Sequence, residues 1–326
     1  MYPDIYFEPS FAEIYENIEH GYAKNIIVET EDGIIESNFI VRKIEELIDG
    51  QQYFDLTTPY GYGGPYIREL SGSKRNLIKS YENYMLNFTK ENNIVSEFVR
   101  FHPWVKNDSD FKTIYENDAI RKTVVTPIHE TETFEKEFSK STRKRIRKSL
   151  REGLSYEVTS KPKDFHSFKE IYYSTMDRNE ASEFYFFDEE YFSHFLEKFR
   201  EHILLIEVFY DEKVIAAGFY FYYNKVLNAH LSGTLADYLY LSPAYIIRYA
   251  AVQWGEKNGA KLLYNGGGTT NSLEDSLYKF KKHFSSSPDY DFVIGKKIWN
   301  PDIYSKLVSM NENASERKDF FPLYRA

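Results

Sequence analysis

The sequence has no cysteine among its 326 residues. This absence excludes a thiol nucleophile, a cysteine-ligated zinc site and a disulfide framework, and it fits the reducing cytoplasm. The sequence also lacks a run of about 20 apolar residues, and residues 1–5 do not begin a signal peptide. We therefore expect a cytoplasmic protein that is neither secreted nor membrane-spanning.

Acidic residues outnumber basic residues. The sequence has 50 Asp and Glu but 41 Lys and Arg, which gives a formal charge of −9. Such a chain is not a general nucleic-acid coat, although a local basic patch still attracts phosphates. In the basic block of residues 140–151, Arg143, Lys144 and Arg147 form a candidate contact with RNA phosphates. The alternative is a solvated helix whose charge is balanced by four upstream acids, Glu130, Glu132, Glu135 and Glu137.

Signals for a metal site are also missing. No second His or carboxylate stands at helical spacing from His230 to make a ligand pair, so we assign no metal. Aromatic residues, in contrast, are abundant, with 29 Tyr and 26 Phe. Tyr suits pockets for polar, sugar-like ligands because it combines a stacking surface with a hydroxyl. The alternative is a composition bias that fills cores and surfaces alike.

The first half of the chain predicts a hairpin followed by a strand, a helix and another strand. Two alternating segments, residues 24–30 and 33–43, are joined by an Asp-Gly turn that is typical of a hairpin. After a short strand at 53–56 and a Gly- and Pro-rich loop, a helix is predicted at 75–92 and a strand at 94–101.

The second half repeats this order with different residues. A three-strand meander is followed by a helix with Ser242 at its N-cap and Gly259 beyond its end. The remaining elements are another strand, a helix and a last strand. The predicted ranges are strands at 203–210, 214–223, 226–233, 261–265 and 289–294, with the last helix at 272–283.

The repeated order predicts an internal duplication and an α+β fold. Each of two tandem domains would have a mostly antiparallel central sheet flanked by helices, and the length of the chain agrees with two domains. We place the domains at residues 1–138 and 139–300, and we expect residues 301–326 to pack back on the first domain as a helix and a tail.

Four motifs resemble the FemX/FemAB family of the GNAT acyltransferase superfamily, and the first half then corresponds to a degenerate GNAT copy. The form without a long helical arm is the nearer match, because no long heptad-bearing insertion occurs. The motifs are Pro59-Tyr60-Gly61-Tyr62-Gly63-Gly64-Pro65, Tyr172-Tyr173-Ser174-Thr175-Met176-Asp177-Arg178, Leu231-Ser232-Gly233-Thr234 with Leu241-Ser242-Pro243-Ala244-Tyr245, and Tyr278-Lys279-Phe280-Lys281.

This resemblance implies a bacterial cell-wall transferase that moves an aminoacyl group from aminoacyl-tRNA to an amine of a nucleotide- or lipid-linked muropeptide, without a metal or redox cofactor. A lipid-linked acceptor would bring the protein to the inner membrane surface. Two alternatives stay open: an acyl-CoA-dependent N-acyltransferase of an amino sugar for surface polysaccharide, and a non-catalytic double-GNAT binding module. Residues 236–243 contain no glycine where CoA-dependent relatives have a glycine-rich phosphate loop, which favours the tRNA-dependent branch.

The resemblance places the chemistry at Phe280 and Lys281. An ammonium beside the reacting carbonyl stabilises the negative charge of the tetrahedral intermediate. The alternative is a solvated helix face with Phe280 in the core. His230 is the candidate general base, with a core histidine as the alternative. Ser232 and Asn265 end two strands that splay apart in GNAT folds and would bind substrate there.

The remaining candidates would bind the substrates. The guanidinium of Arg178 suits a diphosphate, with a surface ion pair to Glu180 or Glu183 as the alternative. The loop tyrosines either contact a ligand or only form a structural turn. The other candidate substrate-binding residues are Tyr185, Tyr60, Tyr62, Tyr66, Arg100, His102 and Tyr245.

Overall fold

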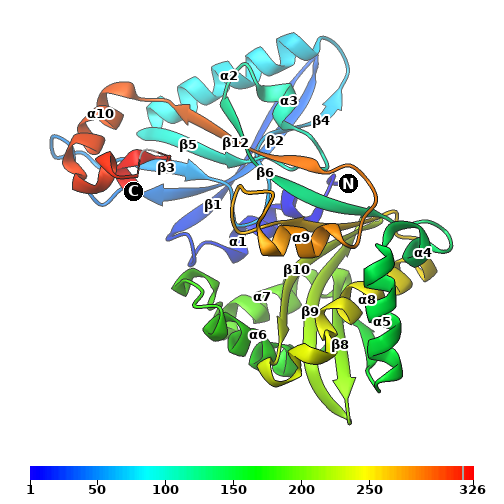
Figure 1. Cartoon of the computed structure of the whole chain (residues 1–326). Coiled ribbons are helices and arrows are strands. Elements are labelled where there is room, and N and C mark those ends of the chain that lie inside the picture. The colour runs from blue at the N-terminus through cyan, green and yellow to red at the C-terminus, as the bar shows by residue number, and fades with distance from the viewer. Residues whose placement is uncertain (318) are drawn as a thin grey trace. The chain divides into compact units, whose positions relative to one another are not determined.

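The computed structural model describes residues 1–317 and 319–326 and divides the chain into two compact units (Figure 1). Unit 1 consists of residues 1–120 and 291–326, and unit 2 of residues 121–290. The boundaries thus lie at 120 and 290, whereas we expected 138 and 300. The reason is strand pairing, because β6 (Glu116–Pro127) pairs with β11 (Leu262–Gly267) of unit 2, and β12 (Tyr290–Ile298) pairs with β5 (Ile94–Arg100) of unit 1.

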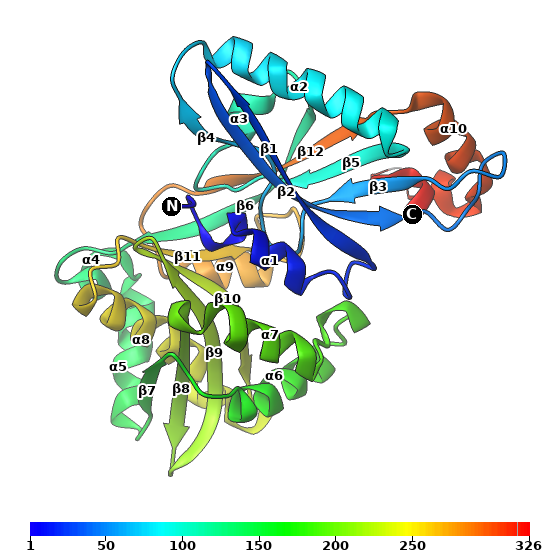
Figure 2. The same cartoon turned by 180° about the vertical axis from the view of Figure 1, so that it is seen from behind.

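Unit 1 contains a sheet with the strand order β1-β2-β3-β5-β12, and β4 pairs with β2. Figures 1 and 2 show α2 on one face of these strands and α1 on the other. The β3–β5 pair is parallel, and the other pairs are antiparallel. The bounds are α1 (Pro9–Ile14), β1 (Gly21–Thr30), β2 (Gly33–Lys43), β3 (Phe54–Thr57), β4 (Tyr66–Leu70), α2 (Lys74–Glu91) and α3 (Asp108–Phe111).

The predicted hairpin of unit 1 is present. Thr30 pairs with Gly33, which leaves a two-residue turn between β1 and β2. Gly33 has φ +141°, and an added Cβ would lie 2.2 Å from the carbonyl oxygen of Glu69, so only glycine fits there. Helix α2 buries Leu77, Tyr81 and Met85 on one face against this sheet.

The C-terminal segment belongs to unit 1. Helix α10 (Pro301–Met310) buries Ile303, Tyr304 and Leu307 in a cluster with Val95 of β5. Near the chain end, the hydroxyls of Tyr324 and Ser96 are hydrogen-bonded at 2.7 Å. Residues 301–326 therefore extend the core of the unit that begins the chain.

Unit 2 has the strand order β6-β11-β10-β9-β8-β7, in which only the β10–β11 pair is parallel. Figures 1 and 2 show α5 and α8 on one face of strands β8–β10, and α6 and α7 on the other. The bounds are α4 (Thr133–Glu137), α5 (Lys140–Arg151), β7 (Ser155–Ser160), α6 (His166–Arg178), α7 (Glu189–Phe199), β8 (Ile203–Tyr210), β9 (Lys213–Tyr223), β10 (Val226–Thr234), α8 (Pro243–Lys257) and α9 (Ser276–Lys282).

Three predicted details of unit 2 need correction. Helix α9 begins at Ser276 and not at 272, because the carboxylate of Asp275 caps it by accepting from the amide of Tyr278 at 2.9 Å. Ser242 precedes α8 as expected, but it has φ +59° and its side chain forms no cap bond. The strand expected at 289–294 is β12, which lies in unit 1 from residue 291 onward.

None of the helices in residues 1–317 and 319–326 combines the length and the apolar character that a membrane crossing requires.

Candidate functional site

The candidate site of unit 2 lies where β10 and β11 stop pairing. Their parallel ladder runs only from Val226↔Leu262 to Asn228↔Tyr264. Beyond it, β11 bulges between Tyr264 and Gly266 and stays paired with β6 alone, while β10 bulges against β9 at residues 229–231. Two strands that part in this way leave backbone groups that can bind a ligand carbonyl or amide.

Lys281 reaches this opening from α9. Its Nζ donates a hydrogen bond of 2.6 Å to the carbonyl oxygen of Gly267, near the end of β11. Gly266, in the bulge, has φ +72°, and an added Cβ would lie 3.4 Å from the same Nζ. The positive φ favours glycine at position 266, where an added Cβ would just touch the ammonium.

The Lys281 ammonium is poorly solvated, although part of the residue is accessible. Burial, together with the positive charges of Arg248 and Arg121, lowers the pKa of Lys281 to about 7, and the carboxylate of Asp275 opposes this shift only in part. At neutral pH, Lys281 is therefore present both as an ammonium, which can donate to an oxyanion, and as an amine, which can accept a proton.

Phe280 and Tyr245 line the region around Lys281. The two rings meet edge to face with centroids 5.0 Å apart, and Phe280 packs in turn on Phe284. Phe280 therefore points toward the core, as the alternative reading held, while the adjacent Lys281 points to β11. The guanidinium of Arg145 lies 4.9 Å from the centre of the Tyr245 ring.

Ser232 and Asn265 lie on the α8 face of the sheet. Ser232 pairs with Gly218, and an added Cβ at Gly218 would lie 2.8 Å from Ile247 of α8. Asn265 donates to the hydroxyl of Thr126 at 2.9 Å, and its buried carbonyl oxygen has no hydrogen-bond partner. Both residues lie two residues before the ends of their strands, on the side that carries Lys281.

His230 lies on the opposite face. Its Nε2 is 2.6 Å from the hydroxyl of Tyr191, and its ring packs among Phe195, Phe219 and Phe221. Burial lowers the pKa of His230 to about 3, so the ring is neutral at pH 7. The structure does not bring His230 together with Lys281, and it favours the core-histidine alternative.

Arg178 and Tyr185 lie on that same opposite side. The Nη1 of Arg178 donates to the carbonyl oxygen of Thr234 at 2.6 Å, where β10 ends. Arg178 is exposed and forms no ion pair with Glu180 or Glu183. Tyr185 is 36% exposed, and its backbone carbonyl accepts from the hydroxyl of Tyr172. Arg178 thus keeps guanidinium donors that face solvent.

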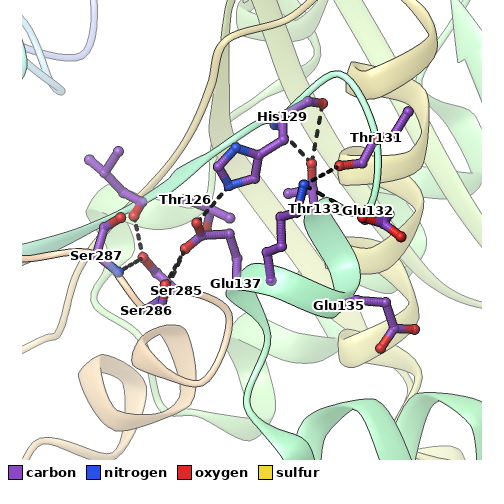
Figure 3. Close-up of polar contacts among 12 residues, drawn as sticks. Thr126, His129, Thr131, Glu132, Thr133, Glu135, Glu137, Ser285, Ser286 and Ser287 are labelled. Atoms are coloured by element: carbon purple, nitrogen blue, oxygen red, sulfur yellow. Dashed lines mark hydrogen bonds and ion pairs between the residues drawn. The ribbon is translucent and has the colours of Figure 1, made fainter.

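The turn that follows α9 is held by Glu137 of α4 (Figure 3). One carboxylate oxygen lies 2.9 Å from Nε2 of His129, and the other accepts from the amide and hydroxyl of Ser286. The hydroxyl of Ser285 donates to the carbonyl of Val125 in β6 at 2.6 Å. These contacts fix the C-terminal end of the helix that carries Lys281.

The loop tyrosines of unit 1 have structural contacts. The Tyr62 ring lies edge to face with Tyr6 and Phe292, and its centroid is 5.1 Å from that of His102. The Tyr60 ring lies 6.2 Å from the ring of Tyr15. These contacts support the reading of the loop as a packed turn.

Tyr66, Arg100 and His102 are also engaged within unit 1. Tyr66 is buried and donates to Glu36 at 3.0 Å. Arg100 donates to the carbonyl of Thr58 at 2.6 Å, and His102 is fully enclosed. None of these residues belongs to the unit that contains Lys281.

The basic helix α5 is partly neutralised. Glu135 forms ion pairs with Arg143 at 3.3 Å and with Arg147 at 2.6 Å. Lys144 is exposed. The structure thus shows the charge balance that the alternative expected for two of the three residues.

Within the part of the chain that the structure describes, no three His, Asp or Glu side chains are grouped so that they could hold a metal ion.

Arg248 is the residue that sequence reasoning missed. It lies in α8 and is 6% exposed, and its guanidinium contacts the hydroxyl and the ring of Tyr220. A signal was available, because a single charge within the apolar run of residues 246–252 is unusual for a helix that covers a sheet.

Residues 136–282 match the model of a family described as an acetyltransferase (GNAT) domain. This range contains β10, α8, β11 and α9, and therefore Lys281 and the two strands that part beside it. The GNAT-type α+β fold predicted from the sequence is confirmed.

Two further similarities point to FemX. The chain is 23% identical over 174 residues to a UDP-N-acetylmuramoylpentapeptide-lysine N(6)-alanyltransferase of Weissella viridescens, an alignment that covers 52% of this chain and 50% of that protein. The chain thus spans about half the length of this curated relative. A crystal structure of FemX has a TM-score of 0.68 at 12% identity, with 93% of this chain and 95% of that chain covered.

A third likeness is to the C-terminal domain of a putative lysylphosphatidylglycerol synthetase from Agrobacterium fabrum, with a TM-score of 0.54, 10% identity, and 84% and 83% of the two chains covered. At such identities the structural likenesses establish the fold. The resemblance to FemX that the four motifs indicated is confirmed at the level of the fold.

Proposed function

We propose that this chain transfers an aminoacyl group from aminoacyl-tRNA to an amine of a nucleotide-linked muramoyl peptide. The observation that carries the proposal is the Lys281 ammonium at the open end of β10 and β11, inside the GNAT-matched range. The alanyltransferase relative acts, by its name, on a lysine N6 of UDP-N-acetylmuramoylpentapeptide, which supports an amine acceptor of this class.

The reaction forms an amide bond and breaks an ester bond. The acceptor amine attacks the ester carbonyl carbon, and negative charge collects on the carbonyl oxygen of the tetrahedral intermediate. The Lys281 ammonium donates to that oxygen, and the ester oxygen leaves with a proton while the amine loses one. One oxyanion donor contributes about 10²–10³-fold in rate.

The two faces of the unit 2 sheet suit two substrates. Arg178 marks the end of β10 on the α6 side, and its free guanidinium donors match a diphosphate. Lys281 and Tyr245 mark the α8 and α9 side. In the proposal the nucleotide-linked acceptor binds on the first side and the acyl donor on the second, so that they meet at the opening between the strands.

The segment before α8 supports a donor other than CoA. Residues 236–241 form the 3-10 helix η4 (Ala236–Leu241), which contains Asp237 and no glycine. Without glycine the backbone of this segment is less able to approach a phosphate closely, and the carboxylate of Asp237 in the first turn would repel it. We place the reaction in the cytoplasm, in keeping with a chain that has no cysteine.

A transfer assay with the full chain tests the donor. The purified protein is mixed with UDP-N-acetylmuramoylpentapeptide and either labelled alanyl-tRNA or labelled acetyl-CoA. We expect label in the peptide only from alanyl-tRNA, and RNase treatment should abolish it. Transfer from acetyl-CoA that survives RNase would instead support the acyl-CoA alternative, and no transfer from either donor would support a binding module.

The acceptor role of Arg178 has its own test. Arg178→Met should raise the KM for the UDP-linked pentapeptide by about tenfold or more, because a charge-assisted bond to phosphate is lost. The KM for the same pentapeptide without the nucleotide serves as the control and should not change. Equal effects on both acceptors would contradict a diphosphate contact.

A further inference from the structure

Arg248 is a buried cation without an anion. It is 6% exposed, its Nε has no hydrogen-bond partner, and no described Asp or Glu forms an ion pair with it. The group that it contacts, the hydroxyl of Tyr220, is neutral, since burial raises the pKa of that phenol. Burying a guanidinium costs free energy, and one neutral hydroxyl offsets little of that cost. The simplest physical reason for its presence is therefore an anionic partner that binds there.

The position of Arg248 on α8 directs it toward Lys281. Tyr245 and Arg248 are three residues apart and share one face of the helix. Tyr245 packs edge to face on Phe280, the neighbour of Lys281 in α9. The face of α8 that carries Arg248 is therefore the face that meets the helix carrying Lys281.

Arg248 and Lys281 also interact as charges. The positive charge of Arg248 is among the influences that lower the pKa of Lys281, so the two cations destabilise each other when nothing lies between them. A single anion between the two would offset both the mutual repulsion and the burial of Arg248.

We propose that Arg248 and Lys281 together form a two-cation site that binds one anionic group of a substrate, a carboxylate or a phosphate, on the α8 and α9 face of unit 2. Arg248 supplies a permanent charge and an unused N–H donor, and Lys281 supplies the second charge beside the reacting carbonyl. This inference rests on the proposed transfer function for the identity of the substrate, whereas anion binding itself is measurable without any transfer.

Calorimetry with inorganic phosphate and with acetate tests the site on the full chain. The titrations are made at pH 6.5, where Lys281, with a pKa of about 7, is mostly charged. Arg248→Met and Lys281→Met should each weaken binding of the preferred anion by about 10- to 100-fold, because each removes a charged hydrogen-bond donor. Arg248→Lys, which keeps the charge, should retain most of the affinity.

Arg75→Met is the matched control, since Arg75 is an exposed residue of α2 in unit 1. Its anion affinity should equal that of the unaltered chain. The anion that binds more tightly, phosphate or acetate, identifies the class of the substrate group.

An unaltered chain that binds neither ion, or an Arg248→Met variant that binds as tightly as the unaltered chain, would overturn the inference. If Arg248→Met fails to fold, Lys281→Met decides, and an unchanged anion affinity in that variant rejects the two-cation site. Anion binding that persists in a chain without transfer activity would reject the proposed function and leave this site in place.

Discussion

The two units have the same order of strands and helix but differ at their parallel strand pair. In unit 1 the β3–β5 ladder continues to Thr57↔Phe98, and the amide of Thr58 bonds to the carbonyl of Phe98 at 3.1 Å. In unit 2 the β10–β11 ladder ends after Asn228↔Tyr264. A closed pair uses its backbone groups internally, whereas an open pair leaves them for a ligand. The parallel strand pair is thus open in unit 2 and closed in unit 1.

The buried charges of the two units differ as well. Unit 1 encloses a carboxylate that has ion-pair partners, Asp55 with Arg42 and Arg325. Unit 2 encloses cations, Arg248 and Lys281, that form no ion pair with any described carboxylate. A buried ion pair destabilises the fold strongly when one partner is removed, while a buried charge without an ion-pair partner at an opening is typical of a site.

If unit 1 is mainly structural, the largest change in stability is expected on substitution of Asp55. Asp55→Asn removes a carboxylate that is 1% exposed and leaves Arg42 and Arg325 without it, so the unfolding free energy should fall by about 3 kcal/mol. Urea denaturation measures the change. Asp49→Asn, which breaks the exposed pair with Lys306, is the control and should cause no measurable loss. If both variants were equally stable, the buried carboxylate of Asp55 would not have the structural role that we assign to unit 1.

The pH dependence of stability should separate the units. Burial raises the pKa of Glu97 to about 7, so the folded chain keeps a proton that the unfolded chain loses at about pH 4.5. Stability from this group therefore falls as the pH rises from about 4.5 to 7, by about 3 kcal/mol in all. Lys281 acts in the opposite sense, because its lowered pKa makes stability rise between about pH 7 and 10.5.

Denaturation at several pH values measures both trends. Glu97→Gln should remove the fall below pH 7 and leave the rise above it, and Lys281→Met should do the reverse. A single variant that removes both trends would show that the two groups do not titrate independently.

The charge on Lys281 should also appear in the kinetics. If the ammonium form donates to the oxyanion, the ratio of the transfer rates of the unaltered chain and of Lys281→Met falls above pH 7, by up to about tenfold per pH unit. The ratio cancels the ionisation of the acceptor amine, which both proteins share. A ratio that rises above pH 7 would instead assign Lys281 the role of the base.

The smallest effect is expected at Arg100 in unit 1. Arg100 donates to the hydroxyl of Thr57 and the carbonyl of Thr58, beside the closed strand pair. Arg100→Met should lower the unfolding free energy by about 1 kcal/mol and leave kcat and KM unchanged. A raised KM with unchanged stability would assign unit 1 a part in substrate binding.

The sequence allowed the main elements to be predicted because their apolar residues alternate or recur regularly. Strands β2 and β8 have the predicted bounds, and α2 begins one residue earlier than expected. Boundaries set by long-range pairing were not predictable, since nothing near residue 290 indicates that β12 returns to β5 of unit 1. Local capping by Asp275 likewise shortened α9.

The site was predictable only in part, for a similar reason. The position of Lys281 followed from its resemblance to a motif, and the structure brings Ser232 and Asn265 to the same face. Which face a strand residue occupies depends on register and bulges. The bulge at residues 229–231 places His230 against Tyr191. The role of Arg248 could be inferred only once the packing of α8 on α9 was known.

The central claim is that unit 2 catalyses transfer through Lys281. The most direct test compares the kcat for alanyl transfer to UDP-N-acetylmuramoylpentapeptide in Lys281→Met and in Lys279→Met, which changes an exposed lysine of the same helix paired with Glu274. We predict a loss of about 10²–10³-fold for Lys281→Met and no change for Lys279→Met. Equal kcat values for the two variants, both folded, would contradict the claim.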